Sequence, residues 1–222
     1  MNDYKERNLE LQIDSFVLGD FETNCYVVRS TAQVRECLII DPGYEAESVV
    51  EFLKEKDLAP KRILLTHGHC DHIAGIAALQ EHFGPIPVGI SCEDAKMLTH
   101  SRHNLSLLMG QPLKFAAPDE EIAAGDVIEQ DGVRLEVLAT PGHTPGCVSF
   151  YCREEEVIFT GDALFAGSVG RTDFPGGSMS TLLQSIRGQL LVLPDQTKVY
   201  SGHGPVTTIG QEKCGNPFIQ QA

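Results

Sequence analysis

The segment THGHCDH, residues 66–72, places three histidines and an aspartate within six consecutive positions. The chain has eight histidines among its 222 residues, so this local concentration is not a consequence of composition. Three imidazoles beside a glycine would pack poorly as an apolar core. Neutral imidazoles together with a carboxylate are the ligands that zinc-like cations select. The segment therefore predicts a metal site to which the fold must bring further ligands.

The order of residues within this segment suggests how the ligands converge. If the preceding strand continues through the segment, alternation places His67 and His69 on one face. Asp71 can reach the same side before His72 begins a helix. Cys70 then falls on the opposite face, and a lone cysteine is more often a small buried apolar residue than a ligand. We therefore leave Cys70 out of the predicted ligand set.

Three later segments each place one metal-binding residue type at the exit of a predicted strand. These are His143 in TPGHTPG (140–146), Asp162 in FTGDALF (159–165) and His203 in YSGHGP (200–205). Each is typical of a turn when taken alone, but their joint occurrence with THGHCDH favours a common site. The other histidines, His82, His100 and His103, are expected on the solvated surface.

The alternation of apolar runs predicts an α/β chain. A hydrophobic content of 42% over 222 residues is sufficient for one globular domain, residues 1–222. The predicted strands are 11–18, 24–30, 36–41, 62–66, 133–139, 147–152, 156–161 and 197–202, and the predicted helices are 45–57, 73–83 and 179–193. Hairpin-like neighbours among these strands favour mixed sheets. Residues 94–120 are the least regular and are predicted to be a helical insertion covering a site.

Charge and cysteine content limit the partners and the compartment. The 31 acidic and 17 basic residues give a net charge of −14, which repels nucleic acid and anionic membrane surfaces. The polar N-terminus does not resemble a signal peptide, and nowhere do eighteen apolar residues run together. The seven cysteines contain no C-x-x-C pair, as expected for reduced thiols. We therefore expect a cytoplasmic protein acting on a small molecule, with no nucleic acid or membrane partner.

The ligand spacing H-x-H-x-D-H, followed by G-H, G-D and G-H, resembles the metallo-β-lactamase-fold superfamily. The segments TNCYVV, IIDPG, TPGHTPG, FTGDALF and GSVGRTDF resemble its hydroxyacylglutathione hydrolase (glyoxalase II) branch, over roughly residues 10–217. The resemblance implies an αββα sandwich, in which two mixed β-sheets lie face to face with helices on the outer faces. It also implies that metals bind at one edge of the sheets.

The resemblance further implies two divalent metal ions and a reaction. His67, His69 and His143 would hold the first ion, Asp71, His72 and His203 the second, and Asp162 would bridge the two. Zinc is favoured, with iron and manganese as alternatives. The ions would share a hydroxide that attacks the substrate, and Asp71 would also act as a catalytic residue by orienting it. The implied reaction is hydrolysis of a small-molecule thioester, S-lactoylglutathione or a related acyl thioester.

Three residues outside the ligand set have candidate supporting roles. The resemblance suggests that Asp41, in IIDPG, accepts a hydrogen bond from a metal-bound imidazole, although a turn aspartate bonding its own backbone is equally consistent. Arg171 and Asp173, in GRTDF, follow Asp162 closely. Arg171 either holds a substrate carboxylate or pairs with Asp173, and we favour pairing because buried arginines are usually paired.

One departure from the glyoxalase II pattern affects the substrate. In that branch a C-terminal helical domain contacts glutathione, whereas only 19 residues follow His203 here, enough for a short helix or tail at 207–218. A glutathione conjugate would therefore have to be recognised by the core and its loops. We expect looser recognition, and the substrate can be a smaller or different thioester.

Other functions of the same fold remain as alternatives. A persulfide dioxygenase would use a single iron held by His67, His143 and Asp162. A β-lactamase is disfavoured because no export signal is visible. A non-enzymatic scaffold is disfavoured because all seven ligand positions are filled, which a scaffold would not require.

Overall fold

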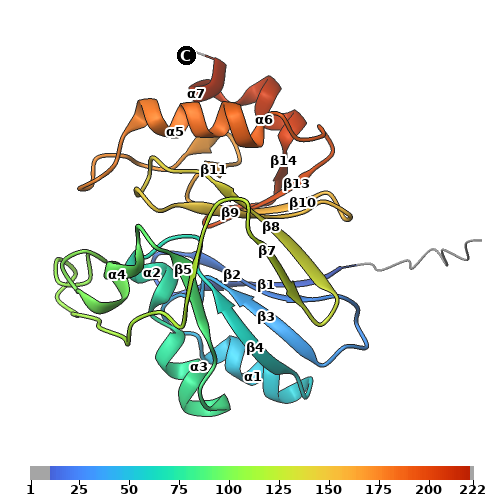
Figure 1. Ribbon diagram of the computed structural model, residues 1–222, viewed down its shortest axis with the longest axis vertical. Coiled ribbons are helices and arrows are strands. Elements are labelled where there is room, and N and C mark those ends of the chain that lie inside the picture. The colour runs from blue at the N-terminus through green and yellow to red at the C-terminus, as the bar shows by residue number, and fades with distance from the viewer. Residues whose placement is uncertain (1–10, 221–222) are drawn as a thin grey trace, which may run out of the picture.

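The protein is a four-layered αββα sandwich (Figure 1). The computed structural model describes residues 11–220, so residues 1–10 and 221–222 of the predicted single domain lie outside the described part. Two six-stranded sheets lie face to face, with α1 (Glu47–Glu55) and α3 (Ile76–Phe83) on one outer side and α5 (Met179–Ser185) and α6 (Ile209–Gly215) on the other. The predicted fold class is confirmed.

The first sheet has the strands in chain order. They are β1 (Gln12–Leu18), β2 (Thr23–Arg29), β3 (Glu36–Ile40), β4 (Ala59–Leu64), β5 (Val88–Ser91) and β6 (Glu120–Ile122). The pairs β1–β2 and β2–β3 are antiparallel, and the pairs from β3 to β6 are parallel. Parallel neighbours need crossover connections, and α1 and α3 supply the first two of them. The short α4 (Ala95–Thr99) lies in the third.

The second sheet has the order β14-β13-β10-β9-β8-β7. Its strands are β7 (Val127–Gln130), β8 (Val133–Ala139), β9 (Val148–Cys152), β10 (Val157–Gly161), β13 (Lys198–Ser201) and β14 (Thr207–Thr208). Only the pair β10–β13 is parallel, so this sheet is also mixed. A small hairpin of β11 (Leu164–Phe165) and β12 (Ser168–Val169) follows β10, and α7 (Pro217–Gln220) ends the described chain.

Strand alternation builds three apolar layers. In β2, Tyr26 and Val28 face the second sheet, whereas Cys25 and Val27 face the side covered by α1 and α3. A third cluster packs the outer face of the second sheet against α5 and α6. Every residue of β2 is buried, and its sequence is an apolar run, residues 25–28, preceded by Thr23 and Asn24 and followed by Arg29. The period of two therefore sets which side chains lie between the sheets.

Two predictions about local structure were wrong. β4 ends at Leu64 instead of continuing through residue 69, because the next residues leave the ladder: the Thr66 N–H donates to Asp41 Oδ1 and its carbonyl accepts from Val148. The helix predicted at 179–193 is α-helical only to Ser185 and continues as a wider π-helical stretch, Ile186–Leu190, which contains a helix-disfavouring glycine.

The segment 94–120 also differs from the helical insertion that the sequence suggested. Apart from α4 and the first residue of β6, it consists of turns and irregular backbone. Within residues 11–220, no helix is both long and apolar enough to cross a membrane.

Candidate metal centre

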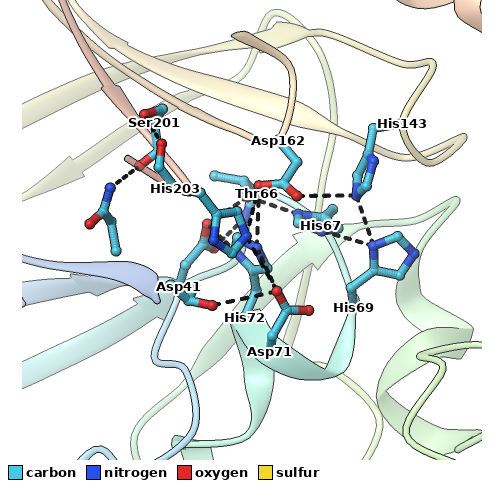
Figure 2. Close-up of polar contacts among 12 residues, drawn as sticks. Asp41, Thr66, His67, His69, Asp71, His72, His143, Asp162, Ser201 and His203 are labelled. Carbon is cyan, nitrogen blue, oxygen red and sulfur yellow. Dashed lines mark hydrogen bonds and ion pairs between the residues drawn. The ribbon is translucent and has the colours of Figure 1, made fainter. Parts of the chain in front are cut away.

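The seven predicted ligands meet at one edge of the sandwich. Their side chains point toward one another in Figure 2, although they come from loops after four strands and from α2 (Cys70–Ile73). The strands are β4, β8, β10 and β13, and the ligands are His67, His69, Asp71, His72, His143, Asp162 and His203. The structure therefore brings together all of the residues that the sequence singled out.

One group of potential ligands consists of imidazoles alone. His67 Nε2 lies 3.1 Å from His69 Nδ1, and His69 Nδ1 lies 2.8 Å from His143 Nε2. All three residues are buried. Three ring nitrogens converging on one point could hold a cation, and we call these residues the histidine group.

A second group combines a carboxylate with two imidazoles. Asp71 Oδ2 lies 3.4 Å from His72 Nε2 and 3.4 Å from His203 Nε2. His72 is fully buried, whereas Asp71 and His203 are partly exposed. These three ligand atoms could also hold a cation, and we call Asp71, His72 and His203 the mixed group.

Asp162 lies between the two groups. Its Oδ2 is 3.4 Å from His143 Nε2, in the histidine group. Its Oδ1 is 3.4 Å from His72 Nε2 and 3.6 Å from His203 Nε2, in the mixed group. The loop after β13 passes so close to Asp162 that residue 202 must be glycine, because a Cβ there would lie 2.3 Å from Asp162 Oδ1. One carboxylate is thus placed to contact two cations at once.

The donor set fits a pair of divalent cations. His72 Nε2 and Asp162 Oδ1 are both buried and have no hydrogen-bond partner among the described residues. An unpaired buried polar atom is costly, and a cation at this point would satisfy both atoms. Imidazole and carboxylate ligands accept zinc, iron and manganese, so the donor chemistry does not select one metal.

Polar groups outside the centre orient the imidazoles. His72 Nδ1 lies 3.0 Å from Asp41 Oδ2, His143 Nδ1 lies 2.7 Å from the Arg171 carbonyl, and His203 Nδ1 lies 3.0 Å from the Phe21 carbonyl. A carbonyl or carboxylate partner fixes the proton on Nδ1, so that Nε2 presents its lone pair to the centre. The rings are therefore held in the tautomer that binds metal.

The carboxylate of Asp41 lies behind the metal centre and has three hydrogen-bond partners. It accepts from the Thr66 N–H at 2.8 Å, from the Thr66 hydroxyl at 2.6 Å and from His72. The same hydroxyl lies 3.2 Å from His67 Nδ1. The predicted contact between Asp41 and a histidine of the ligand set is present, and sequence reasoning missed Thr66 because a threonine after a strand gives no signal.

The two groups differ in protonation. Burial, together with the neighbouring His143, lowers the pKa of His69 from 6.5 to about 3. Burial would also lower the pKa of His72, but the carboxylates of Asp71 and Asp162 outweigh it and raise that pKa well above its usual range. Burial would lower the pKa of His203 too, yet Asp71 and Asp162 raise it.

A pocket of about 360 Å³ opens onto the centre. Its wall is formed by residues outside the ligand set: Phe21, Cys70, Leu105, Met109, Phe165, Val169, Arg171 and Phe174. The segment 94–120 supplies Leu105 and Met109, so its predicted position beside the site is confirmed. Sequence reasoning placed Cys70 away from the site, whereas it lines the pocket, because the strand that would have turned it away ends at Leu64.

Arg171 pairs with Asp173 as predicted, but not for the predicted reason. The guanidinium donates to both carboxylate oxygens at 2.7 Å and lies 4.0 Å from the ring centre of Phe174. Its side chain is 58% exposed, so burial does not force the pair. The histidines expected on the surface, His82, His100 and His103, are exposed.

Comparison with known proteins agrees with this fold and donor set. Residues 18–203 match the family model of the metallo-beta-lactamase superfamily. The chain is 41% identical to the hydroxyacylglutathione hydrolase GloC of Haemophilus influenzae over 211 residues, which covers 94% of this chain and 98% of that protein. The chain therefore belongs to the metallo-beta-lactamase superfamily, a family of metal-dependent hydrolases.

Solved structures carry the same arrangement of sheets. The crystal structure of BLEG-1 B3 metallo-beta-lactamase is 41% identical, with a TM-score of 0.88 over 94% of this chain and 99% of that one. The structure of TTHA1623 in a di-iron-bound form is 36% identical, with a TM-score of 0.80 over 92% of this chain and 99% of that one. GloC and BLEG-1 are named for different activities, and TTHA1623 is described in a di-iron-bound form, so the family itself does not define the substrate or the metal.

Proposed function

We propose that this protein is a binuclear metal-dependent thioester hydrolase of the glyoxalase II type. The first cation is held by His67, His69 and His143, the second by Asp71, His72 and His203, and Asp162 bridges them. Zinc is the favoured metal in both positions. The proposed substrate is S-lactoylglutathione or a related acyl thioester.

The observation that carries this proposal is the position of Asp162. Its two oxygens face different groups of ligands, which supports two cations sharing one carboxylate. A mononuclear iron persulfide dioxygenase would need His67, His143 and Asp162 and would leave His203 without a role. His203 instead points into the centre, with Nδ1 anchored on the Phe21 carbonyl. We therefore favour the hydrolase over the dioxygenase.

When bound, a pair of divalent cations supplies Lewis acidity that lowers the pKa of water and polarises a thioester carbonyl. Asp71 lines the pocket, so its carboxylate can accept a hydrogen bond from the attacking water and take its proton. A thiolate leaves readily, so no strong general acid is needed on that side. The apolar pocket wall excludes bulk water around the reacting carbonyl.

The pocket lining is mostly apolar, which supports a thioester substrate that carries few charged groups. Arg171 is the one lysine or arginine among the pocket-lining residues, and it is already paired with Asp173. A glutathione conjugate would therefore be recognised by the loop backbone and by the guanidinium of Arg171. The relation to GloC supports S-lactoylglutathione, while the apolar wall supports acceptance of other acyl groups. We place the activity in the cytoplasm, where the seven unpaired cysteines remain reduced.

The direct test combines metal analysis with two assays. Protein loaded with zinc should bind two ions per chain and hydrolyse S-lactoylglutathione, S-acetylglutathione or other members of an acyl thioester panel, with release of the free thiol. Protein loaded with iron is assayed in parallel for oxygen consumption with glutathione persulfide. One iron per chain with oxygen uptake, and no thiol release from any thioester, would replace the hydrolase assignment with the dioxygenase.

Replacement of Asp71 by alanine tests the assigned roles. We expect kcat/KM for thioester hydrolysis to fall by about 10²- to 10³-fold, because the second cation and the orientation of the water are both disturbed. Asp57→Ala, which removes an exposed aspartate paired with Arg35 at the surface, is the control and should keep full activity. Unchanged turnover of the Asp71 variant would contradict the mechanism.

A further inference from the structure

Asp94 stands at the start of α4 but does not cap that helix. Aspartate in this position usually accepts a hydrogen bond from its own helix, and here the Asp94 side chain makes no such bond. The residue is 0% exposed. A buried carboxylate needs hydrogen-bond donors, so the question is which part of the molecule supplies them.

The donors come from the two loops that carry the histidine group. Asp94 Oδ2 accepts from the Thr144 hydroxyl at 2.6 Å and from the Gly68 N–H at 3.3 Å, and Oδ1 accepts from the Gly146 N–H at 2.9 Å. Gly68 lies between His67 and His69, and Thr144 directly follows His143. One carboxylate thus links the loop after β4 to the loop after β8.

Close packing around Asp94 leaves these loops little freedom. A Cβ on Gly146 would lie 2.6 Å from Asp94 Oδ1 and 2.3 Å from Ser91 Oγ, and the Ser91 hydroxyl donates to the Gly146 carbonyl at 2.5 Å. A Cβ on Gly68 would lie 2.4 Å from the Met97 Cβ. Glycine at both positions lets the loops press against residues 91–97, which belong to a connection far from either loop in the sequence.

We propose that Asp94 is a positioning residue for the first cation: it ties together the two loops whose three imidazoles form the histidine group. It contacts none of the metal-facing ring nitrogens and acts through backbone and hydroxyl donors. This inference rests on the metal ligands assigned in the proposed function. It assigns a role to a residue between β5 and α4, outside every motif that carries ligands.

The proposal is tested by Co²⁺ binding, which needs no turnover. In a His203→Ala background the mixed group is disabled, so Co²⁺ titration followed by visible d–d absorption reports the histidine group. Adding Asp94→Asn should weaken this Co²⁺ by about 10- to 100-fold, the usual effect of removing an outer partner of a metal ligand. Asparagine keeps the shape of the side chain and one acceptor oxygen. Its amide N–H then faces the Gly68 N–H, and two donors cannot form a hydrogen bond with each other.

Glu212 offers a matched control. It is also a buried carboxylate with three donors, the Thr207 hydroxyl, the Gly167 N–H and the Asn216 amide, but it braces the helix α6 and not the ligand loops. Glu212→Gln in the same background should lower the thermal midpoint without changing Co²⁺ affinity. Thr144→Ser, which keeps a hydroxyl for Asp94, should bind Co²⁺ like the parent, and Thr144→Val should weaken it.

The outcomes separate the proposals. If Asp94→Asn lowers stability as Glu212→Gln does, but keeps Co²⁺ affinity within a factor of two, the positioning role is wrong. If both variants weaken Co²⁺ equally, the effect is general destabilisation and the role is also wrong. A parent protein that binds Co²⁺ but cleaves no thioester contradicts the proposed function and leaves this test intact, whereas one that binds no Co²⁺ overturns both.

Discussion

The histidine group and the mixed group lie side by side, yet they are built differently. His67, His69 and His143 are 0%, 5% and 2% exposed, and all three ligands are imidazoles. In the mixed group only His72 is fully buried, and the side chains of Asp71 and His203 are 17% and 27% exposed. The histidine group is the more deeply buried half of the centre, although both halves line the pocket, through His69 and His143 in one and Asp71 and His203 in the other.

The difference extends to charge. Burial lowers the pKa values of His67 and His69, so both rings are neutral at neutral pH and each has one ring nitrogen free to bind a cation. The carboxylates of Asp71 and Asp162 raise the pKa values of His72 and His203, so protons compete with a cation for these two rings. The histidine group is therefore ready for a cation, and the mixed group must exchange protons for one. This comparison predicts a tightly held first ion and a more exchangeable second ion.

Asp162→Ala should have the largest effect, because this residue joins the two halves. The substitution removes a ligand from both groups, and we expect kcat/KM for thioester hydrolysis to fall on the order of 10³-fold or more. Metal content should fall below two ions per chain. Asp173→Ala removes an exposed aspartate from a nearby loop and serves as the control for metal content. Two ions retained by the Asp162 variant would show that the halves do not depend on this bridge.

The ligands themselves could be predicted from the sequence because their chemistry is rare. Histidine is uncommon in this chain, and its concentration at THGHCDH, together with single donors at strand exits, leaves few interpretations. The individual strands could be predicted because alternation is local, as in β2, where the period of two separates Cys25 and Val27 from Tyr26 and Val28. The αββα arrangement of the layers was expected only from the resemblance to the superfamily. The ligand chemistry and the strand periodicity are both local properties of the sequence.

The supporting residues could not be predicted, because their roles depend on contacts between distant segments. The Thr66 hydroxyl contacts His67, and the Thr66 N–H donates to Asp41, 25 residues earlier, so the backbone leaves the hydrogen-bond ladder of β4 before this residue. Asp94 precedes a short helix, and its sequence suggests an N-cap and not a link between two ligand loops. Phe21 lines the pocket from a β-hairpin turn with no motif. Such roles appear only when the loops are placed in space.

Asp41→Asn should weaken metal binding in the two groups unequally, with an effect smaller than that of Asp162→Ala. Asp41 contacts His72 directly but reaches His67 only through Thr66, so the second ion should be weakened more than the first. We expect about 10- to 100-fold weaker binding of the second ion, measured by competition with a chelator. Equal weakening of both ions would indicate that Asp41 supports the centre as a whole, through the end of β4, and not His72 in particular.

The pH dependence of metal content has the smallest expected effect and tests the comparison most directly. Below the raised pKa values of His72 and His203, each proton that a cation must displace lowers its apparent affinity about tenfold per pH unit. His69, with a pKa of about 3, is neutral between pH 5 and 8, so a cation has no second ring proton to displace from it. Asp71 does not compete either: burial would raise its pKa, but the neighbouring His72 and His203 lower it.

Metal content measured after equilibration at intervals between about pH 8 and pH 5 should therefore fall first from two ions to one. The His203→Ala variant, which keeps the histidine group, should hold its single ion over the same range. If both ions leave together, the two groups form one cooperative site and their different burial has no consequence for binding. If the ion of the variant leaves first, the imidazoles of the histidine group are the weaker ligands, and the raised pKa values of His72 and His203 do not limit metal occupancy.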